Sequence, residues 1–303
     1  MNKEEIIKKI IIENKDLFKE NINYNFIDSG FNNTIFDINN KYIVKINNND
    51  LKSFEKEIKF YQENYNKLYI PKLYKYDLSK TNVPVYYQII EKINGKTLYY
   101  YWHDMNEFER EEIIKKLVTV LKDIHIESSQ YDFSSYIKEK IMKCLNIVSN
   151  YFKESEYNII LKSLNYYDLI LKDNKFCLIH NDLHFDNIFK DQNNNIKLID
   201  FNDMMIAPFD FEFRIFYMMQ DRPFKWASLE TEKFQKREDY INLFTYVKKY
   251  YQELNELKYL DFRMLIYEVL NDIQLLCRFN ETELKERIIE DSFKIVNYFE
   301  KSS

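Results

Sequence analysis

The sequence predicts an α+β fold with two lobes: a small antiparallel β-sheet lobe carrying one helix, and a larger, mostly helical lobe. Short runs of alternating apolar and polar residues, separated by Asn-rich turns, dominate residues 24–47 and return between residues 72 and 92, which is typical of strands. Beyond residue 107, apolar residues recur mainly at helical spacing. We therefore expect one lobe over residues 1–91 and a second over residues 92–303.

Five strands and one helix make up the expected small lobe. The strands are expected over residues 24–28, 34–38, 41–46, 72–77 and 85–92. The helix is expected over residues 51–68, because Asp50 is a suitable N-cap and apolar residues follow it at helical spacing.

Seven helices and one β-rich island make up the expected large lobe. The helices are expected over residues 107–127, 134–153, 155–171, 209–220, 234–254, 258–280 and 282–299. The island covers residues 175–201, where two short strand-like runs lie on either side of a turn of three Asn residues. This island also contains most of the polar residues that are candidates for catalysis or metal binding.

The composition excludes several classes of protein. Only 2 of the 303 residues are Gly, and Gly30 and Gly95 are too far apart to share a loop, so the glycine-rich Rossmann and P-loop motifs are both impossible. No apolar run approaches the roughly 18 residues needed to span a bilayer. The 3 Cys are scattered without a C-x-x-C pair, which indicates a reducing compartment. We expect a cytoplasmic monomer without a membrane partner.

The charge is uneven along the chain. Residues 1–91 hold 14 Lys and Arg against 13 Asp and Glu, whereas residues 92–303 hold 30 against 36, giving the net −5 of the whole chain. This balance provides no basic footprint for nucleic acid. The acidic second lobe favours a cationic partner, although solvated helix faces would produce the same excess.

Polar side chains suited to catalysis are concentrated between His180 and Asp203. His180, Asp182 and Asn187 form the spacing H-x-D-x-x-x-x-N, and Asp200 follows in the context L-I-D-F. Mg²⁺ prefers hard oxygen ligands, of which proteins commonly supply one or two beside substrate phosphates. Asn187 and Asp200 suit that role, and Asp182 would then be placed to accept the proton of an attacking hydroxyl.

These residues resemble the aminoglycoside phosphotransferase/choline kinase family, small-molecule kinases with a protein-kinase-like fold. The resemblance is carried by HNDLHFDN and LIDFND and extends over about residues 24–220. It implies that Asp182 is the catalytic base and that Asn187 and Asp200 hold Mg²⁺. It also implies that His180 orders the catalytic segment. Asn181, the middle residue of the HND triplet, resembles the residue found there in the 2''-type aminoglycoside kinases and the choline kinases.

The small lobe carries residues that match the same family independently. Lys45 ends the alternating strand KYIVKI, where the resemblance implies a lysine that binds the nucleotide phosphates. Glu57 on the following helix is expected to pair with it. Glu55 is the competing partner, because the phase of the helix cannot be fixed from sequence.

Two further segments resemble the nucleotide-binding parts of this family. SGFNNTIF resembles the loop between the first two strands, where Ser29, Gly30 and Asn33 would face phosphates. QIIEKINGKTL resembles the segment that joins the lobes, where backbone groups near Ile90 and Ile93 would meet the base of ATP or GTP.

The sequence departs from the family pattern after the metal-binding aspartate. Asn202 stands where a glycine is usual, and the downstream acidic residue is either Asp210 or Glu212. Asp203, together with these two carboxylates, is a candidate for contact with the substrate. Asp203 is equally suited to capping the next segment.

Other roles remain open for the histidines and for one aspartate. His180, Asp182 and His184 alternate as zinc ligands in a hydrolase might be spaced, but no third His or Cys lies nearby. His184 is either near the transferred phosphate or a solvent-facing loop residue. Asp186 is either a loop hydrogen-bonder or a third metal ligand.

Taken with the resemblance, these residues predict a kinase that transfers the γ-phosphate of ATP or GTP, with Mg²⁺, to a hydroxyl of a small cationic molecule. An aminoglycoside is the expected acceptor, which would make the protein an antibiotic-resistance enzyme. Choline, ethanolamine or another amino alcohol or sugar is the alternative. A catalytically silent kinase-like binding or spore-coat protein is the alternative from another class.

Overall fold

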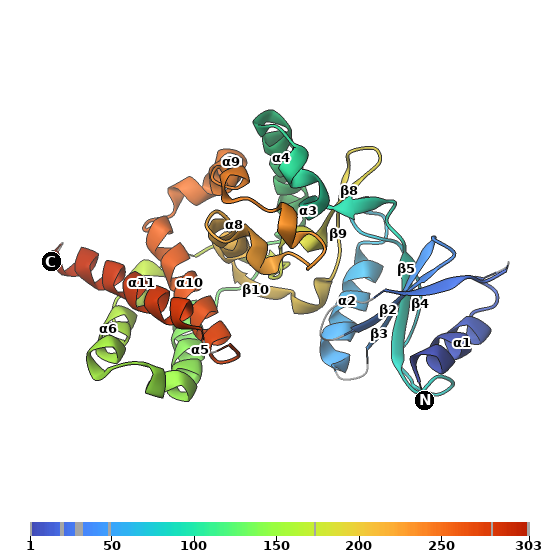
Figure 1. Ribbon diagram of the computed structural model, residues 1–303, viewed down its shortest axis with the longest axis horizontal. Coiled ribbons are helices and arrows are strands. Elements are labelled where there is room, and N and C mark those ends of the chain that lie inside the picture. Colours follow the sequence, from blue (N-terminus) through green and yellow to red (C-terminus); the bar gives the residue numbers. More distant parts are fainter. Residues whose placement is uncertain are drawn as a thin grey trace. The chain divides into compact units, whose positions relative to one another are not determined.

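The computed structural model describes residues 2–18, 21–27, 33–47, 50–172, 174–279 and 281–301. The chain forms two compact units (Figure 1). The first consists of Met1–Met105, His184–Met204 and Trp226–Phe234, and the second of Asn106–Leu183, Met205–Lys225 and Gln235–Ser303. Each unit therefore gathers segments that are far apart in sequence. The lobe boundary near residue 91 stays a prediction.

The first unit is built on a five-stranded antiparallel sheet, as predicted. Its strands are β1 (Tyr24–Ile27), β2 (Asn33–Ile38), β3 (Tyr42–Asn47), β4 (Leu73–Asp77) and β5 (Tyr86–Glu91). They lie in the order β1-β2-β3-β5-β4, with every neighbouring pair antiparallel. The central position of β3 matters for the site, because this strand carries Lys45.

Two helices pack with this sheet, one more than the sequence analysis placed in the small lobe. Helix α2 (Leu51–Glu63) begins after Asp50, whose side chain accepts a hydrogen bond from the amide of Ser53. The additional helix is α1 (Lys3–Glu13), which begins with a capping box between Asn2 and Glu5. Its residues Ile7, Ile10 and Ile11 recur at helical spacing and are buried.

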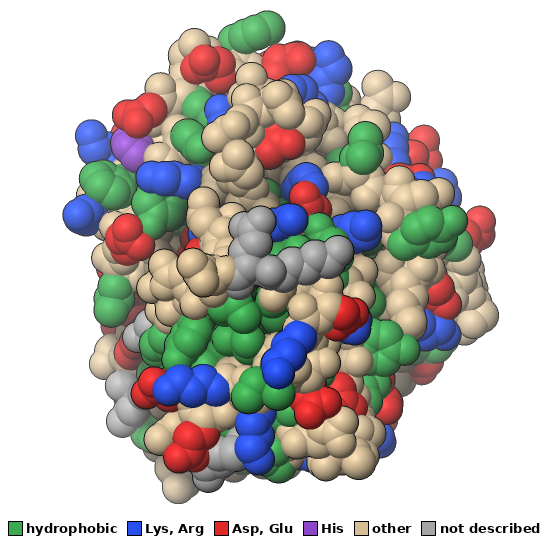
Figure 2. Space-filling model, turned by 90° about the vertical axis from the view of Figure 1, so that its right-hand side faces the viewer, with side chains coloured by type: hydrophobic (Ala, Val, Ile, Leu, Met, Phe, Trp, Pro, Cys, Tyr) green, Lys and Arg blue, Asp and Glu red, His purple; other side chains and the backbone are tan. Residues whose placement is uncertain are grey.

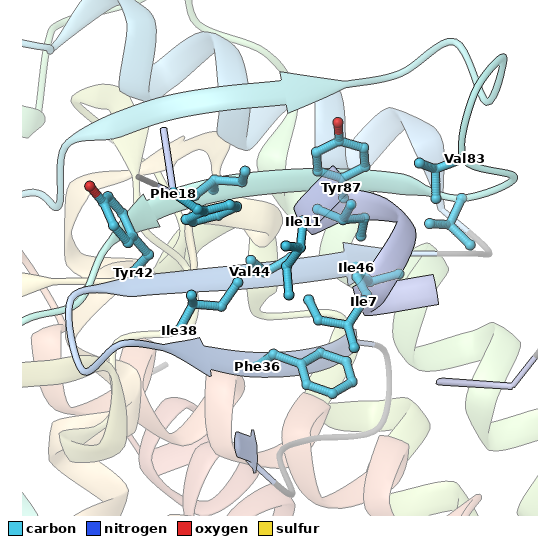
Figure 3. Close-up of a cluster of buried hydrophobic side chains, with 13 residues drawn as sticks. Ile7, Ile11, Phe18, Phe36, Ile38, Tyr42, Val44, Ile46, Val83 and Tyr87 are labelled. Carbon is cyan, nitrogen blue, oxygen red and sulfur yellow. The ribbon is translucent and has the colours of Figure 1, made fainter. Parts of the chain in front are cut away.

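The alternation of strand β3 separates a hydrophobic core from the polar site. Val44 and Ile46 lie in a buried cluster with Ile7 and Ile11 of α1, which Figure 3 shows against one face of the sheet. Because successive strand side chains point to opposite faces, Lys45 projects to the other face, toward α2. The core on one side of the sheet thus fixes which residue of β3 reaches the site.

A second, smaller sheet completes the first unit. It consists of β6 (Gly95–Thr97), β8 (Ile188–Asp191) and β9 (Ile196–Leu198), in the order β6-β8-β9, and α3 (Leu98–Tyr101) follows β6 directly. Gly95 is required here by close packing, because a Cβ atom at this position would overlap the backbone carbonyl oxygen of Lys190. The strands expected in the island around the Asn turn are confirmed as β8 and β9.

Basic and acidic side chains are mixed on the molecular face shown in Figure 2. Typical surface pairs of the first unit are Lys8–Glu4 and Lys75–Asp16, all well exposed. Such exposed pairs contribute little stability. This face therefore presents no extended field of one sign.

The second unit is mostly helical. Its helices are α4 (Glu107–Ile124), α5 (Phe133–Val148), α6 (Glu154–Leu164), α7 (Tyr167–Ile170), α8 (Arg214–Met219), α9 (Leu243–Tyr250), α10 (Leu260–Leu276) and α11 (Thr282–Lys301). A two-stranded antiparallel sheet of β7 (Phe176–Ile179) and β10 (Met205–Pro208) lies among them. Helix α10 packs against α5 and α11, and α11 packs against α6. In the part of the chain that the structure describes, no helix has the length and apolarity to span a membrane.

Several expected helices are shorter than predicted: the helix expected over 51–68 ends at Glu63, the helix expected over 155–171 is divided into α6 and α7, and two others lose half of their length or more. The helix expected over 209–220 begins only at Arg214, because Phe209–Phe213 forms a 3₁₀ turn in which every side chain is buried. The helix expected over 234–254 is reduced to α9, preceded by short turns. In both places tertiary contacts override the helical spacing of the sequence.

Candidate active site

Lys45 and Glu57 form a buried ion pair in the first unit. Lys45 Nζ donates to both carboxylate oxygens of Glu57, at 3.1 and 2.9 Å. Both residues are nearly inaccessible to solvent, whereas Glu55 is exposed. The partner of Lys45 is therefore Glu57, which the sequence favoured but could not distinguish from Glu55.

Glu57 is held in place by two further donors. Gln88 Nε2 donates to Oε2 at 2.6 Å, and Tyr61 Oη donates to Oε1 at 3.2 Å. Gln88 lies on β5 directly opposite Lys45, and Tyr61 lies one turn after Glu57 on α2. The carboxylate is thus fixed by both the sheet and the helix.

Lys45 also reaches Asp200, which follows strand β9. Lys45 Nζ donates to Asp200 Oδ1 at 2.7 Å, and the amide of Asn202 donates to the same oxygen. Asp200 has a left-handed backbone (φ 64°), a conformation that Asp tolerates better than most residues. Unlike Glu57, its side chain remains 39% exposed. Asp200 therefore presents its carboxylate to solvent beside a fixed ammonium group.

The two carboxylates determine the charge of Lys45. Burial alone would lower the pKa of its ammonium group, but the negative charges of Glu57 and Asp200 outweigh burial, so the pKa is raised above its ordinary value. Lys45 is a permanent cation at neutral pH.

Asn187 lies in a short turn that is also part of the first unit. The turn Phe185–Asn187 begins after His184, and Asn187 Nδ2 lies 3.2 Å from His184 Nε2. The backbone carbonyl of Asn187 accepts a hydrogen bond from Ile199, next to Asp200. Phe185 is fully buried and packs against Trp102 and Tyr99. Asn187 and Asp200 are therefore joined through the backbone of the β8–β9 hairpin.

His180 and Asp182 belong to the second unit, on the segment that leaves β7. His180 is fully buried, and its Nδ1 accepts a hydrogen bond from the amide of Asp182 at 3.3 Å. Between them, Asn181 has a left-handed backbone (φ 71°). This hydrogen bond joins the His180 ring to the backbone that carries Asp182, which is itself only half-buried.

Glu212 fixes the backbone of the same segment. Its Oε2 accepts from the amide of His180 at 2.6 Å, and its Oε1 accepts from the amide of Asn181 at 3.0 Å. Burial would raise the pKa of Glu212, but His125 and His180 outweigh burial and lower it. Glu212 is therefore an anion that holds the segment before Asp182.

Arg214 is a neighbour of Asp182 that sequence analysis missed. Its guanidinium donates to the carbonyl of Asn181 at 2.7 Å and to that of Phe211 at 2.8 Å, and it lies over the Phe211 ring. Burial lowers the pKa of Arg214, while the negative charges of Glu212 and Asp182 act in the opposite direction. Arg214 stands in a run of mostly buried residues, and its spacing from Asp182 matches no pattern that would have singled it out.

The three acidic residues proposed to contact substrate are placed very differently. Asp210 and Glu212 are fully buried, and Asp210 is bound by Arg263 and Tyr267. Because neither carboxylate is accessible to solvent, neither can contact a substrate, and the expected substrate contact is wrong for both. Asp210 and Glu212 instead hold neighbouring parts of the second unit in place. Asp203 is exposed.

The expected nucleotide-binding residues are only partly covered by the structure. Ser29 and Gly30 lie outside the described residues. Asn33 begins β2, and its Oδ1 accepts from Asn47 Nδ2 at 3.0 Å. Ile90 lies in β5, and the carbonyl of Ile93, just beyond it, accepts from the amide of Gly95.

The donor set of the hairpin fits a hard divalent cation better than zinc. Asp200 offers an exposed carboxylate and Asn187 an amide, the oxygen groups that Mg²⁺ prefers. Among the residues the structure describes, no group of three or more His, Cys, Asp or Glu side chains is arranged to hold a metal ion. A zinc site built on His180, Asp182 and His184 therefore has no support in the geometry.

Comparisons with known proteins give several solved structures of the same fold. The chain resembles the ADP-bound aminoglycoside phosphotransferase APH(2'')-Ib, with 21% identity over 97% of each chain and a TM-score of 0.67. It resembles the gentamicin complex of APH(2'')-IIa, with 20% identity over 98% of this chain and 96% of that chain and a TM-score of 0.64. It also resembles the GDP complex of wild-type aminoglycoside 2'-phosphotransferase-IIIa, with 15% identity over 98% and 99% and a TM-score of 0.65.

At these identities the solved structures establish the fold alone. No curated protein sequence gives a significant match. A family model is decisive, because the one described as "APH: Phosphotransferase enzyme family" matches residues 23–235, well over half of the chain. This chain therefore belongs to the phosphotransferase enzyme family.

Proposed function

We propose that this phosphotransferase moves the γ-phosphate of ATP or GTP, with Mg²⁺, to a hydroxyl group of an aminoglycoside. The observation that carries the proposal is the buried contact of Lys45 with both Glu57 and Asp200. Lys45 and Glu57 are removed from water and are costly to keep without a use, because burial penalises each charge, while Asp200 meets Lys45 at the solvent-exposed edge of this pair. Phosphoryl transfer gives all three a use.

Each group has a defined task in the proposed reaction. Lys45, oriented by Glu57, binds the α- and β-phosphates. Asp200 and Asn187 would hold Mg²⁺, which when bound neutralises charge on the phosphates. Asp182 orients the acceptor hydroxyl and takes its proton. Asp182 is connected to the proposed metal-binding residues along the chain, because Asn187 follows it by only five residues.

The aminoglycoside acceptor is suggested by the solved structures that this chain resembles. Their names include a gentamicin complex and a streptomycin–ATP complex of APH(2'')-IIa. ATP and GTP are both retained as donors, since neighbours are described with ADP, ATP and GDP. Choline and other amino alcohols are the next acceptors to test.

A nucleotide-consumption screen tests the proposal. Purified protein with Mg²⁺ and ATP or GTP is offered aminoglycosides, choline, ethanolamine and amino sugars, and products are identified by mass. We expect phosphorylation of at least one aminoglycoside. Turnover only with an amino alcohol would replace the acceptor, and no turnover with any acceptor would favour a silent binding protein.

Variants of the site test the assigned roles. Asp182→Asn should lower kcat by about 10²–10⁴-fold, the usual contribution of a general base, while nucleotide affinity stays near that of the wild type. Asp200→Asn should instead weaken Mg²⁺-dependent nucleotide binding. Asp191→Asn, at the turn of the β8–β9 hairpin, is the matched control, because Asp191 has no assigned role in the reaction. Equal loss of turnover and binding in Asp182→Asn, or stoichiometric zinc in the purified protein, would overturn the assignment.

A further inference from the structure

Asp186, next to Asn187, binds two segments that are remote in sequence. Its Oδ1 accepts a hydrogen bond from Thr97 Oγ1 at 3.1 Å, and its Oδ2 accepts one from the backbone amide of Ser228 at 3.1 Å. Thr97 ends strand β6, whereas Ser228 follows α8. One half-buried carboxylate thus connects three parts of the first unit.

The segment that contains Ser228 is an excursion of the chain. Residues 226–234 belong to the first unit, although the residues on both sides of them belong to the second. Within this segment, Ser228 and Thr231 are bonded to each other through their hydroxyl groups and backbone, and Thr231 is fully buried. The segment therefore has a defined conformation of its own.

Two other contacts hold this excursion to the first unit. Glu230 accepts a hydrogen bond from Tyr100, and together with burial this raises the pKa of the phenol to about 12. The ring of Phe234 stacks on His103, with centroids 4.8 Å apart and planes at 10°. Asp186 links the excursion to the turn of Asn187.

We propose that Asp186 is a positioning residue that clamps residues 226–234 and Thr97 to the turn presenting Asn187 to the metal. This proposal rests on the proposed function, which gives Asn187 its metal. Both oxygens of Asp186 already accept hydrogen bonds from separate segments, so the carboxylate suits a clamp better than a third metal ligand. A clamp acts by holding the Asn187 oxygen where the cation needs it.

Two substitutions separate the clamp from the ligand. Asp186→Ala removes both hydrogen bonds. Asp186→Asn keeps the geometry, because its amide oxygen can accept from Ser228 and its amide nitrogen can donate to Thr97 Oγ1. Asp191→Ala is the matched control, because Asp191 also accepts two backbone hydrogen bonds in the same unit, at the β8–β9 turn.

Two measurements on the full chain are needed. The first is hydrogen exchange of the peptide covering residues 226–234, which depends on the clamp and not on catalysis. We expect Asp186→Ala to exchange about tenfold faster there, as for the loss of one hydrogen bond of ordinary strength. The second is the Mg²⁺ concentration that half-saturates nucleotide binding, which should rise about tenfold in Asp186→Ala. Asp186→Asn should stay within about threefold of the wild type in both, and Asp191→Ala should change neither.

Each departure from this pattern overturns a defined statement. Unchanged exchange of residues 226–234 in Asp186→Ala would overturn the clamp. A Mg²⁺ requirement raised as much by Asp186→Asn as by Asp186→Ala would make Asp186 a metal ligand instead. An equal effect of Asp191→Ala would reduce the result to general destabilisation. A wild-type protein that binds no Mg²⁺–nucleotide would overturn the proposed function, while the exchange measurement would still decide the clamp.

Discussion

Replacing Glu57 by Gln tests the central ion pair of the first unit. The substitution keeps the shape of the side chain but removes one of the two negative charges that Lys45 contacts. It also replaces one oxygen with a donor, although Lys45, Gln88 and Tyr61 all donate to this group. At least one of these donors must then lose its acceptor.

The size of the effect follows from burial. Glu57 is 1% exposed and Lys45 is 5% exposed, so water cannot replace the lost contacts. Removing one partner of a buried ion pair lowers the free energy of unfolding by about 3–5 kcal/mol. Because Lys45 keeps its contact with Asp200, we expect a loss of about 3 kcal/mol. For a unit of this size, that loss corresponds to a fall in the melting temperature of about 8 °C.

Thermal unfolding followed by circular dichroism measures this change, and calorimetry with ADP and Mg²⁺ measures its consequence for binding. We expect nucleotide affinity to fall about tenfold, because Lys45 loses the group that orients it. Glu55→Gln is the control, since Glu55 is exposed on the same helix and should change stability by less than about 0.5 kcal/mol. Equal melting temperatures for the two variants would refute the argument from burial.

Three further predictions concern the supports of the site. Arg214→Met should lower kcat about tenfold with little change in nucleotide affinity, because the carbonyl of Asn181, just before Asp182, loses its hydrogen-bond donor. Steady-state kinetics measure this change, and Arg214→Lys should recover part of the lost kcat. The pKa of Glu212 is lowered, so its contribution to stability is present above its ordinary pKa of 4.5 and is lost as the pH falls through the folded-state value. Melting temperatures measured from pH 7 to pH 3 should show this loss. Glu212→Gln should be less stable than the wild type at pH 7 and should lose less stability in acid. Gly95→Ala should cost about 1–3 kcal/mol, because its Cβ meets the backbone of Lys190; a denaturation midpoint equal to that of the wild type would contradict it.

The parts of the fold that sequence predicted are those determined by local pattern. Successive side chains of strand β3 meet different surroundings, the core with α1 on one face of the sheet and α2 on the other. Helix α2 begins where Asp50 caps it. The failure at residues 209–213 has the opposite cause. Asp210 and Glu212 are drawn inward by Arg263 and the backbone of His180, contacts that no local pattern reveals.

In the candidate site, too, the residues that local spacing identifies were predicted, whereas those that depend on tertiary packing were not. Asp182 and Asn187 share one short segment, so their spacing was visible in the sequence. The choice between Glu57 and Glu55 depended on the rotation of α2 about its axis, which only packing fixes. Arg214 and residues 226–234 escaped notice because their role depends on contacts between segments far apart in the chain.

The buried carboxylates of residues 92–303 are not the ones that would attract a cationic acceptor. Asp210 is matched by Arg263 in full burial, and Asp272 is contacted by both Arg222 and Arg287. Carboxylates neutralised in this way stabilise the helical unit and attract no cation from solvent, because their field is cancelled at short range. Each such pair adds no negative charge to the net, so the excess of 36 acidic over 30 basic residues comes from carboxylates outside these pairs. A cationic acceptor must therefore be held by carboxylates outside these pairs, such as the exposed Asp203, and the acceptor screen tests whether the cationic class is preferred.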